Sequence, residues 1–237
     1  RKISGDSRQR RRFVQLSYGC LNTDLAVAPQ KAASTLGNLF TTMSKKKPNF
    51  FEKIGLALGI LKREVSVLVL GLDNSGKSTL LTHLKPKKGD ITEVAPTVGF
   101  SVEGFKMGGL KFTCFDMSGQ SKYRSLWEQY YGDADAIIWV IDSTDKVRMC
   151  VVQDELENMF DHKHLRDKQF PILFFANKMD LPSAYTAVEC MEELELDELE
   201  RPWHISASNA LSGKGVENGV QWLAEQLTKK TKGGGGK

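Results

Sequence analysis

Residues 71–78 fit the pattern G-x-x-x-x-G-K-[ST], in which a glycine-rich loop wraps around the phosphates of a nucleotide. The glycines permit close backbone approach, and the amides of the loop and of the following helix N-terminus point at the anion. Lys77 is expected to neutralise the β- and γ-phosphates, Ser78 to take one magnesium position, and Thr79 to bind the α-phosphate. The residues expected to bind the nucleotide here are Gly71, Asp73, Asn74, Ser75, Gly76, Lys77, Ser78 and Thr79.

A second motif selects the base. Asn177, Lys178 and Asp180 follow directly after an apolar strand-like segment. A carboxylate at Asp180 can accept hydrogen bonds from the N1–H and the exocyclic amine of guanine, whereas adenine has no such donor pair. Asn177 is expected to brace the loop and the Lys178 stem to lie along the base. A backbone N–H in the segment Ser206-Ala207-Ser208 is expected to meet the guanine O6.

Between these motifs lie the residues expected to respond to the γ-phosphate. Asp116 is placed to bind magnesium through water, the Gly119 N–H to reach the γ-phosphate, and Gln120 to orient the attacking water. Thr97, on the loop after the first helix, is expected to coordinate magnesium through its hydroxyl. The predicted catalytic residues are therefore Gln120, Lys77 and Thr97, and the predicted metal ligands are Ser78, Thr97 and Asp116.

The surrounding segments alternate between strands and helices. Apolar or β-branched runs at 65–70, 100–107, 110–115, 136–141, 170–176 and 203–206 predict six strands, with helices beginning near 76 and at 145–160, 184–199 and 216–229. This alternation predicts an α/β fold with a mostly parallel six-stranded sheet and helices on both faces. Gly108 and Gly109 predict a two-residue hairpin, which makes one strand antiparallel.

The charge of the chain is unevenly distributed. The 237 residues carry a net +4, but residues 1–48 alone carry a net +8 and the rest of the chain sums to −4. Contact with an anionic membrane or RNA, a targeting role, and a solvated disordered tail all fit such a segment, and these alternatives stay open. We expect no nucleic-acid partner, because a dedicated nucleic-acid protein carries its basic surface on the folded body.

Cysteines and histidines indicate no further metal site. The four cysteines and four histidines are scattered without zinc-ligand spacing, which fits free thiols in a reducing compartment. No apolar run approaches the roughly 18–20 residues that a spanning helix needs, so we expect no transmembrane segment.

The segment before the first predicted strand has helical periodicity. Phe50, Phe51, Ile54, Leu58 and Leu61 recur on about one face of a helix. This helix either lies in a membrane interface beside basic residues or packs on the domain, and both alternatives stay open. The expected organisation is a basic extension or targeting segment at 1–48, an amphipathic helix at 49–63, a GTP-binding domain at 64–230 and a flexible tail at 231–237.

With these residues in hand, the sequence resembles the small GTPase superfamily, and within it the ADP-ribosylation-factor-like branch. The resemblance covers about residues 50–229 and rests on segments 71–78, 96–100, 115–120, 126–131 and 171–181, and on 202–208. Asp73 stands where other small GTPases often have glycine, and an aspartate there is typical of this branch. Ser118 departs from the glycine that most of the branch has there, but Gly119 is retained, so we expect the switch to work.

The resemblance implies a P-loop NTPase G domain that binds GTP or GDP with Mg²⁺ and hydrolyses GTP slowly. In such proteins a hairpin, here 100–115, slides between the switch segments and couples the nucleotide state to release of the N-terminal amphipathic helix to a membrane. The implied partners are a GTP-dependent effector or coat complex, an exchange factor and a GTPase-activating protein. Relatives of this kind recruit the Bardet–Biedl complex at the cilium base, which implies a cytoplasmic, peripheral-membrane protein in ciliary trafficking.

The mode of membrane attachment, the cellular address and the amount of GTP turnover each have an alternative. Met43 is followed by Ser44, and the C-terminal residues contain no prenylation cysteine, so membrane attachment is expected to rest on the helix and basic residues alone. The basic extension leaves a mitochondrial or other organellar address as an alternative. A structural subunit with the GTPase fold and little turnover is the alternative function. No arginine can be assigned as a catalytic finger from sequence, so an activating partner is expected to supply one.

Overall fold

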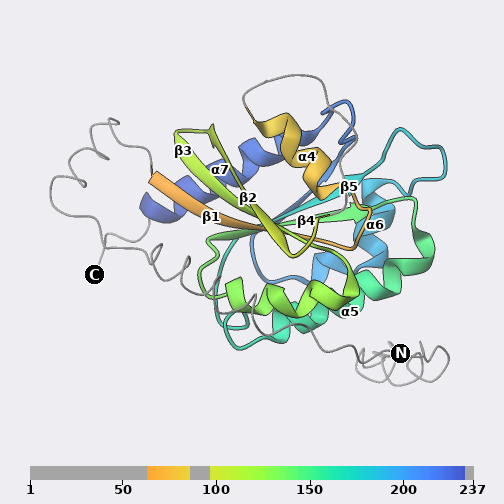
Figure 1. Cartoon of the computed structure of the whole chain (residues 1–237), viewed down its shortest axis with the longest axis horizontal. Helices are drawn as coiled ribbons and strands as arrows, with labels where there is room; N and C mark the ends of the chain where they lie inside the picture. Colours follow the sequence, from red (N-terminus) through yellow and green to blue (C-terminus); the bar gives the residue numbers. More distant parts are fainter. Residues whose placement is uncertain (1–62, 86–96, 233–237) are drawn as a thin grey trace, which may run out of the picture. The chain divides into compact units, whose positions relative to one another are not determined.

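The structure is a computed structural model that describes residues 63–85 and 97–232. Within these residues, six strands form one sheet in the order β2-β3-β1-β4-β5-β6 (Figure 1). All neighbouring strands are parallel except β2 and β3, which pair antiparallel. The strands are β1 (Arg63–Leu70), β2 (Phe100–Met107), β3 (Leu110–Met117), β4 (Ala136–Asp142), β5 (Ile172–Asn177) and β6 (Trp203–Ala207).

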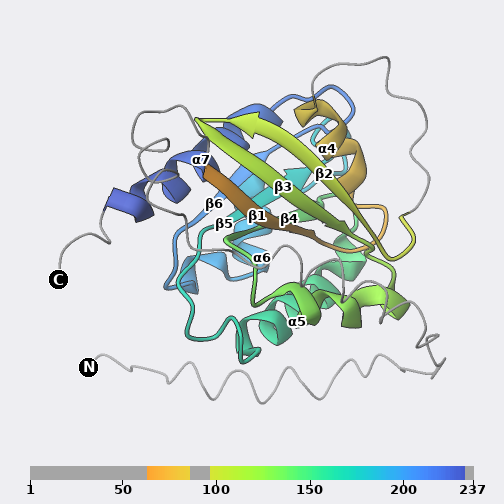
Figure 2. The same ribbon diagram turned by 60° about the vertical axis from the view of Figure 1, so that its left-hand side comes forward.

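Helices cover both faces of this sheet. One face lies under α4 and α7, and α5 lies on the opposite side (Figures 1 and 2). The α-helices are α4 (Lys77–Leu84), α5 (Met149–Asp161), α6 (Ala187–Glu193) and α7 (Val216–Lys232), and the 3₁₀ segments are η1 (Ser121–Tyr130), η2 (Lys146–Arg148) and η3 (Leu196–Glu198). The predicted α/β fold, with a mostly parallel sheet and one antiparallel strand, is confirmed.

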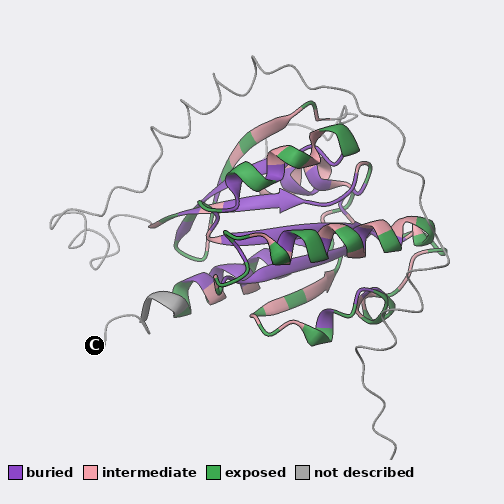
Figure 3. Cartoon of the chain, turned by 90° about the horizontal axis from the view of Figure 1, so that it is seen from below, coloured by how far each residue is buried: buried purple, intermediate pink, exposed green. Residues whose placement is uncertain are grey.

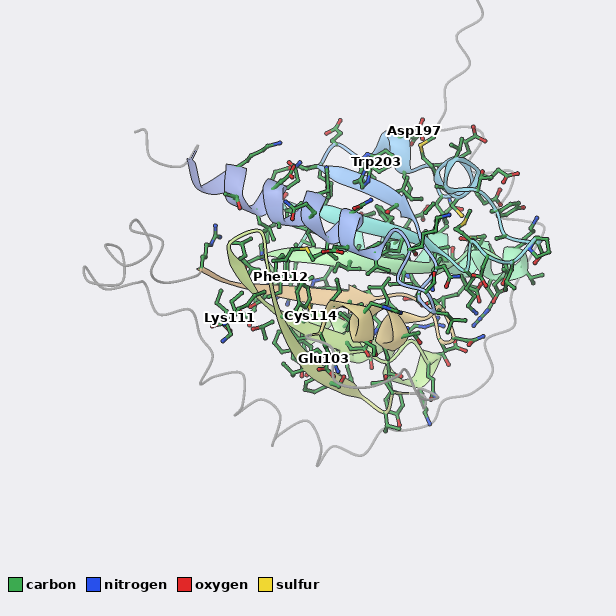
Figure 4. The ribbon with its side chains drawn as sticks, turned by 90° about the horizontal axis from the view of Figure 1, so that it is seen from above. Glu103, Lys111, Phe112, Cys114, Asp197 and Trp203 are labelled. Carbon is green, nitrogen blue, oxygen red and sulfur yellow. The ribbon has the colours of Figure 1, made fainter. Side chains whose placement is uncertain are left out.

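Because helices cover both faces of the sheet, its central strands β4 and β5 are apolar up to their last residue. Every residue of β4 and β5 is buried, as a central strand between two helical layers requires (Figure 3). On the α4 and α7 side, alternate residues such as Val67 and Ile138 pack with Leu80 and Leu223. Figure 4 views this side and labels Phe112 and Cys114 of β3, which belong to the same core. On the other side the Trp127 and Trp139 rings meet edge to face at 5.7 Å.

The β2–β3 hairpin turns at Gly108 and Gly109, as the sequence predicts. Their φ angles of 55° and 78° lie in the left-handed region, which a two-residue turn of this type needs at both positions. A Cβ on Gly108 would come within 2.7 Å of the Ala224 Cβ, so the turn also approaches α7 closely. The hairpin register pairs Met107 with Leu110 at the turn and Phe100 with Met117 at the open end.

Two of the predicted helices are each divided into two elements in the structure. The predicted helix 145–160 begins as η2 and continues as α5, and the predicted helix 184–199 is divided into α6 and η3. Glu195 adopts a left-handed conformation with φ of 50°, which interrupts the second of these. The 3₁₀ segment η1 has no counterpart among the predicted helices.

Several predictions fall on residues that the structure does not describe. The extension at 1–48, residues 49–62 of the predicted amphipathic helix and the tail at 233–237 lie outside the described ranges. Residue 63 already belongs to β1. Within the described ranges, the structure contains no helix with the length and apolar character of a membrane span.

Candidate nucleotide site

The sequence-predicted residues meet at the carboxyl edge of the sheet. The phosphate loop leaves β1, Asp116 lies near the end of β3, Asn177 ends β5, and Ala207 ends β6. Because parallel strands all end at the same edge, residues separated by more than a hundred positions are brought together there. A pocket at this edge is lined by Asp73, Asn74, Gly76, Lys77, Ser78, Thr79, Thr97, Ser118, Gly119 and Gln120.

The phosphate loop folds around the Lys77 side chain. Its Nζ donates to the carbonyls of Gly71 at 3.0 Å and Leu72 at 2.7 Å, and the residue is only 7% exposed. Burial lowers the pKa of Lys77 to about 8, although the nearby carboxylates of Asp116 and Asp73 act in the opposite direction. A cation buried under these conditions fits an anionic ligand, which would restore its preference for the charged form.

Gly76 closes the loop at the start of α4. Its φ is +95°, and a Cβ there would come within 2.4 Å of the Asn177 Nδ2. Only glycine fits such a left-handed position with a side chain this close. The Ser75 Oγ is buried without a hydrogen-bond partner among the described residues. Glycine at this closely approached position and a buried unsatisfied hydroxyl in the loop fit a bound phosphate chain.

Three oxygen-bearing side chains meet beside Lys77. The Ser78 Oγ lies 3.0 Å from the Thr97 Oγ1, and it also donates to Asp116 Oδ2. The other carboxylate oxygen of Asp116 is buried and has no partner within residues 63–85 and 97–232. Burial raises the pKa of Asp116, while the Ser78 hydroxyl and Lys77 act to lower it. Hydroxyl and carboxylate oxygens with an unsatisfied acceptor fit a magnesium ion, which keeps water and phosphate among its ligands.

The peptides around Gly119 are held by η1. The Trp127 indole donates to the Ser118 carbonyl, and the Arg124 Nε donates to the Gly119 carbonyl, each at 3.0 Å. In a trans peptide the N–H points away from the C=O of the same unit, so these bonds orient the amides of Gly119 and Gln120 away from η1. A Cβ on Gly119 would lie 2.3 Å from the Asp73 nitrogen, which shows how closely this segment approaches the phosphate loop.

Asn177 joins the two halves of the site. Its side chain, 1% exposed, donates to the Ser75 carbonyl at 2.8 Å and accepts from the Ser208 hydroxyl and the Ala210 amide. It therefore connects the phosphate loop to the loop after β6. These contacts are compatible with the bracing role that the sequence predicts for Asn177.

The remaining base-side residues occupy the loops after β5 and β6. The Lys178 Nζ donates to Asp142 Oδ2 at 2.6 Å, and Asp180 is exposed. Burial alone would raise the pKa of Asp142, but its bonds from Lys178 and Thr144 outweigh this and lower it.

Three residues at the end of β6 are the candidate donors to the guanine O6: Ser206 and Ala207 end the strand, and Ser208 follows it. The Ser208 amide donates to the Ala176 carbonyl, and the Ser206 hydroxyl donates to the Gly215 carbonyl. Ala207 is exposed at the end of β6. Of the three residues considered from sequence, Ser208 thus has its amide bonded within the protein, and Ala207 is the most exposed.

The structure adds residues that the sequence did not indicate. Arg124, Trp127 and Asp142 support the predicted residues, and Arg148 donates to the carboxylate of Asp73 at 2.9 Å. Asp142 ends a buried strand, and a polar residue at that position is a signal that could have found it. Arg124 and Arg148 lie in segments with no motif of their own, so sequence offered no signal for them.

Comparisons with known proteins agree with this geometry. The family model described as ADP-ribosylation factor family matches residues 51–227. ADP-ribosylation factor-like protein 6 of Danio rerio is 50% identical over 178 residues, covering 75% of this chain and 96% of the relative. The protein of the same name from Caenorhabditis elegans is 41% identical over 182 residues, covering 76% and 95%.

A solved structure is similar as well. It is the Arl6 BBS3 small GTPase from Trypanosoma brucei with the bound nucleotide analogue GppNp, at 44% identity and a TM-score of 0.66. The match covers 70% of this chain and 98% of that one.

The buried state of Lys77 predicts a pH signature for ligand binding. Phosphate oxygens favour the ammonium form, so binding should raise the Lys77 pKa above its ligand-free value of about 8 and take up a proton. We expect a larger proton uptake at about pH 8.5 than at about pH 7, because more of the ligand-free Lys77 is neutral at the higher pH. Affinity should therefore fall as the pH rises above 8.

Isothermal titration calorimetry of GDP binding to nucleotide-stripped protein measures this uptake. Each pH requires two buffers that differ in ionisation enthalpy. Equal proton uptake at the two pH values would contradict the assignment to Lys77.

Proposed function

This chain belongs to the ADP-ribosylation factor family, and we propose that it is a trafficking switch whose GTP-bound form recruits an effector to a membrane. The chain is a GTPase that binds GTP and GDP with Mg²⁺.

On the phosphate side, we assign phosphate binding to the loop backbone and Lys77. Its ammonium, held beside the Gly71 and Leu72 carbonyls, is placed to bridge the β- and γ-phosphates. Ser78, Thr97 and Asp116 would hold Mg²⁺, Asp116 through water, and the ion would neutralise charge that develops on the phosphates. Thr79 is assigned to the α-phosphate. It lines the same pocket at the start of α4.

On the base side, we assign guanine recognition to Asp180, with the Ala207 amide at O6. Lys178 supports this arrangement, because its ion pair with Asp142 holds its side chain in place, and we assign its stem to lie along the base. An adenine ring would leave Asp180 without its two donors, which disfavours ATP.

For hydrolysis, we assign Gln120 to orienting the attacking water, with Lys77 and Thr97 acting on the γ-phosphate. Gln120 lines the pocket beside Gly119, on the segment that Trp127 and Arg124 hold in place. An activating partner is expected to supply the transition-state arginine, so the intrinsic rate is slow.

The observation that carries the switch proposal is the position of the β2–β3 hairpin. Thr97 lies three residues before Phe100, where β2 begins, and Gly119 lies two residues after Met117, where β3 ends. Phe100 and Met117 are paired, and the Ser118 amide donates to the Gly99 carbonyl at 2.9 Å. Both expected γ-phosphate sensors are therefore attached to one rigid element, so a change at the phosphate can move the whole hairpin.

Residues 49–63 are proposed to respond to that movement. In this proposal the segment docks on the domain in the GDP state and binds a membrane surface in the GTP state. The similarity to ADP-ribosylation factor-like protein 6 supports a coat of the Bardet–Biedl type as effector and the cilium base as its place of action.

A first prediction concerns Gln120→Leu. The variant should lower the intrinsic GTP hydrolysis rate about tenfold from its slow level, which is on the order of 10⁻⁴ per second, because leucine cannot orient water. Single-turnover phosphate release measures the rate, and GDP affinity should be unchanged. An undiminished rate would remove Gln120 from this role.

A second prediction tests recruitment. Protein loaded with the non-hydrolysable analogue GppNp should retain a ciliary coat complex from a lysate of ciliated cells, and GDP-loaded protein should not. Mass spectrometry identifies the retained subunits, and a Lys77→Ala variant that binds no nucleotide is the control. Equal retention by both loaded forms would contradict a switch and favour a static structural subunit.

A further inference from the structure

The phosphate loop carries a carboxylate at a place where a phosphate-binding site should avoid one. Asp73 lines the pocket, its backbone nitrogen lies next to Gly119, and its side chain is 46% exposed. The field of Asp73 reaches the Lys77 ammonium, since it acts to raise the pKa of that group. A negative charge at this position repels a triphosphate more than a diphosphate, because the additional charge lies at the γ-position.

Two arginines from distant segments meet this carboxylate. Arg148 donates to Asp73 twice, from Nη1 to the carboxylate Oδ1 at 2.9 Å and from Nη2 to the backbone carbonyl at 3.3 Å. Arg124 places its Nη2 4.0 Å from the same Oδ1. Both arginines also act on the Lys77 pKa, which places them within electrostatic reach of the phosphate site.

Each arginine is itself fixed by a second acidic residue. The Arg148 Nε donates to Asp145, which precedes it in the η2 turn. Burial alone would lower the pKa of Arg148, but its bonds with Asp145 and Asp73 outweigh this and raise it. Arg124 pairs with Glu155 of α5 at 2.9 Å and is 15% exposed. Each guanidinium is therefore held by more than one acidic residue.

We propose that Arg148, assisted by Arg124, is a positioning residue for GTP: it neutralises Asp73 and holds this carboxylate off the γ-phosphate position. Through this contact the pair sets the preference for GTP over GDP. Arg124 also donates to the Gly119 carbonyl, so the same cluster joins the phosphate loop to the segment that carries Gln120. The inference rests on the nucleotide site proposed above.

The test compares Arg148→Ala with the double variant Asp73→Asn, Arg148→Ala. Arg148→Ala leaves the Asp73 charge uncompensated and should lower the affinity for GppNp relative to GDP about tenfold, or about 1.4 kcal/mol. Asp73→Asn removes the charge that needs compensation, so the double variant should regain the wild-type ratio to within about twofold. Arg166→Ala is the matched control, because Arg166 is exposed and its ion pair is with the adjacent Asp167.

Stopped-flow association and dissociation of fluorescent GppNp and GDP with the full-length chain together give both affinities. Equal loss for the two nucleotides, or a ratio that Asp73→Asn fails to restore, would overturn the proposal and leave Arg148 a structural role. Arg148→Gln, which keeps a polar side chain of similar length, carries the same test if the alanine variant does not fold. Failure of the wild-type protein to bind either nucleotide would instead overturn the nucleotide site itself.

Discussion

The ammonium of Lys77 is buried at the carboxyl edge of the sheet, between main-chain carbonyls of its own loop, and the rest of the site is arranged around it. Such a charge is costly to bury without a counter-ion, as its lowered pKa reflects. The loop can hold it only because Gly76 adopts a left-handed conformation beside Asn177. A bound triphosphate would supply the missing negative charge, so ligand binding would also stabilise the loop.

From this point, buried polar contacts extend the site in two directions. Asn177 connects the phosphate loop to the loops after β5 and β6, so the base side cannot move independently of the phosphate side. In the other direction, Ser78 contacts Thr97, just before β2, and Asp116, near the end of β3, both at the open end of the β2–β3 hairpin. A γ-phosphate that engages these residues can therefore bias the hairpin between two positions.

The fold and most of the candidate site were predictable because their signals are local. The loop at 71–78 and the Asn177–Asp180 segment have fixed spacings, and their positions after buried strands bring them to one edge of a parallel sheet. The arginines on Asp73 could not be predicted: Arg148 is 75 positions away, and the helix predicted at 145–160 does not indicate which distant residue its side chain contacts. The 3₁₀ segment η1 was not predicted either. Its Trp127 and Arg124 donate to the carbonyls of Ser118 and Gly119, and such tertiary contacts leave no local signal in the sequence.

The central claim is that this pocket holds a phosphate chain at Lys77 and a guanine at Asp180. The most direct measurement is competition against fluorescent GDP on nucleotide-stripped protein in magnesium buffer, with unlabelled GTP, GDP and ATP compared. GTP and GDP should displace the probe at concentrations at least about a hundredfold below ATP, because only guanine satisfies both acceptors of the aspartate. Displacement by ATP at the same concentration as GTP would contradict the account.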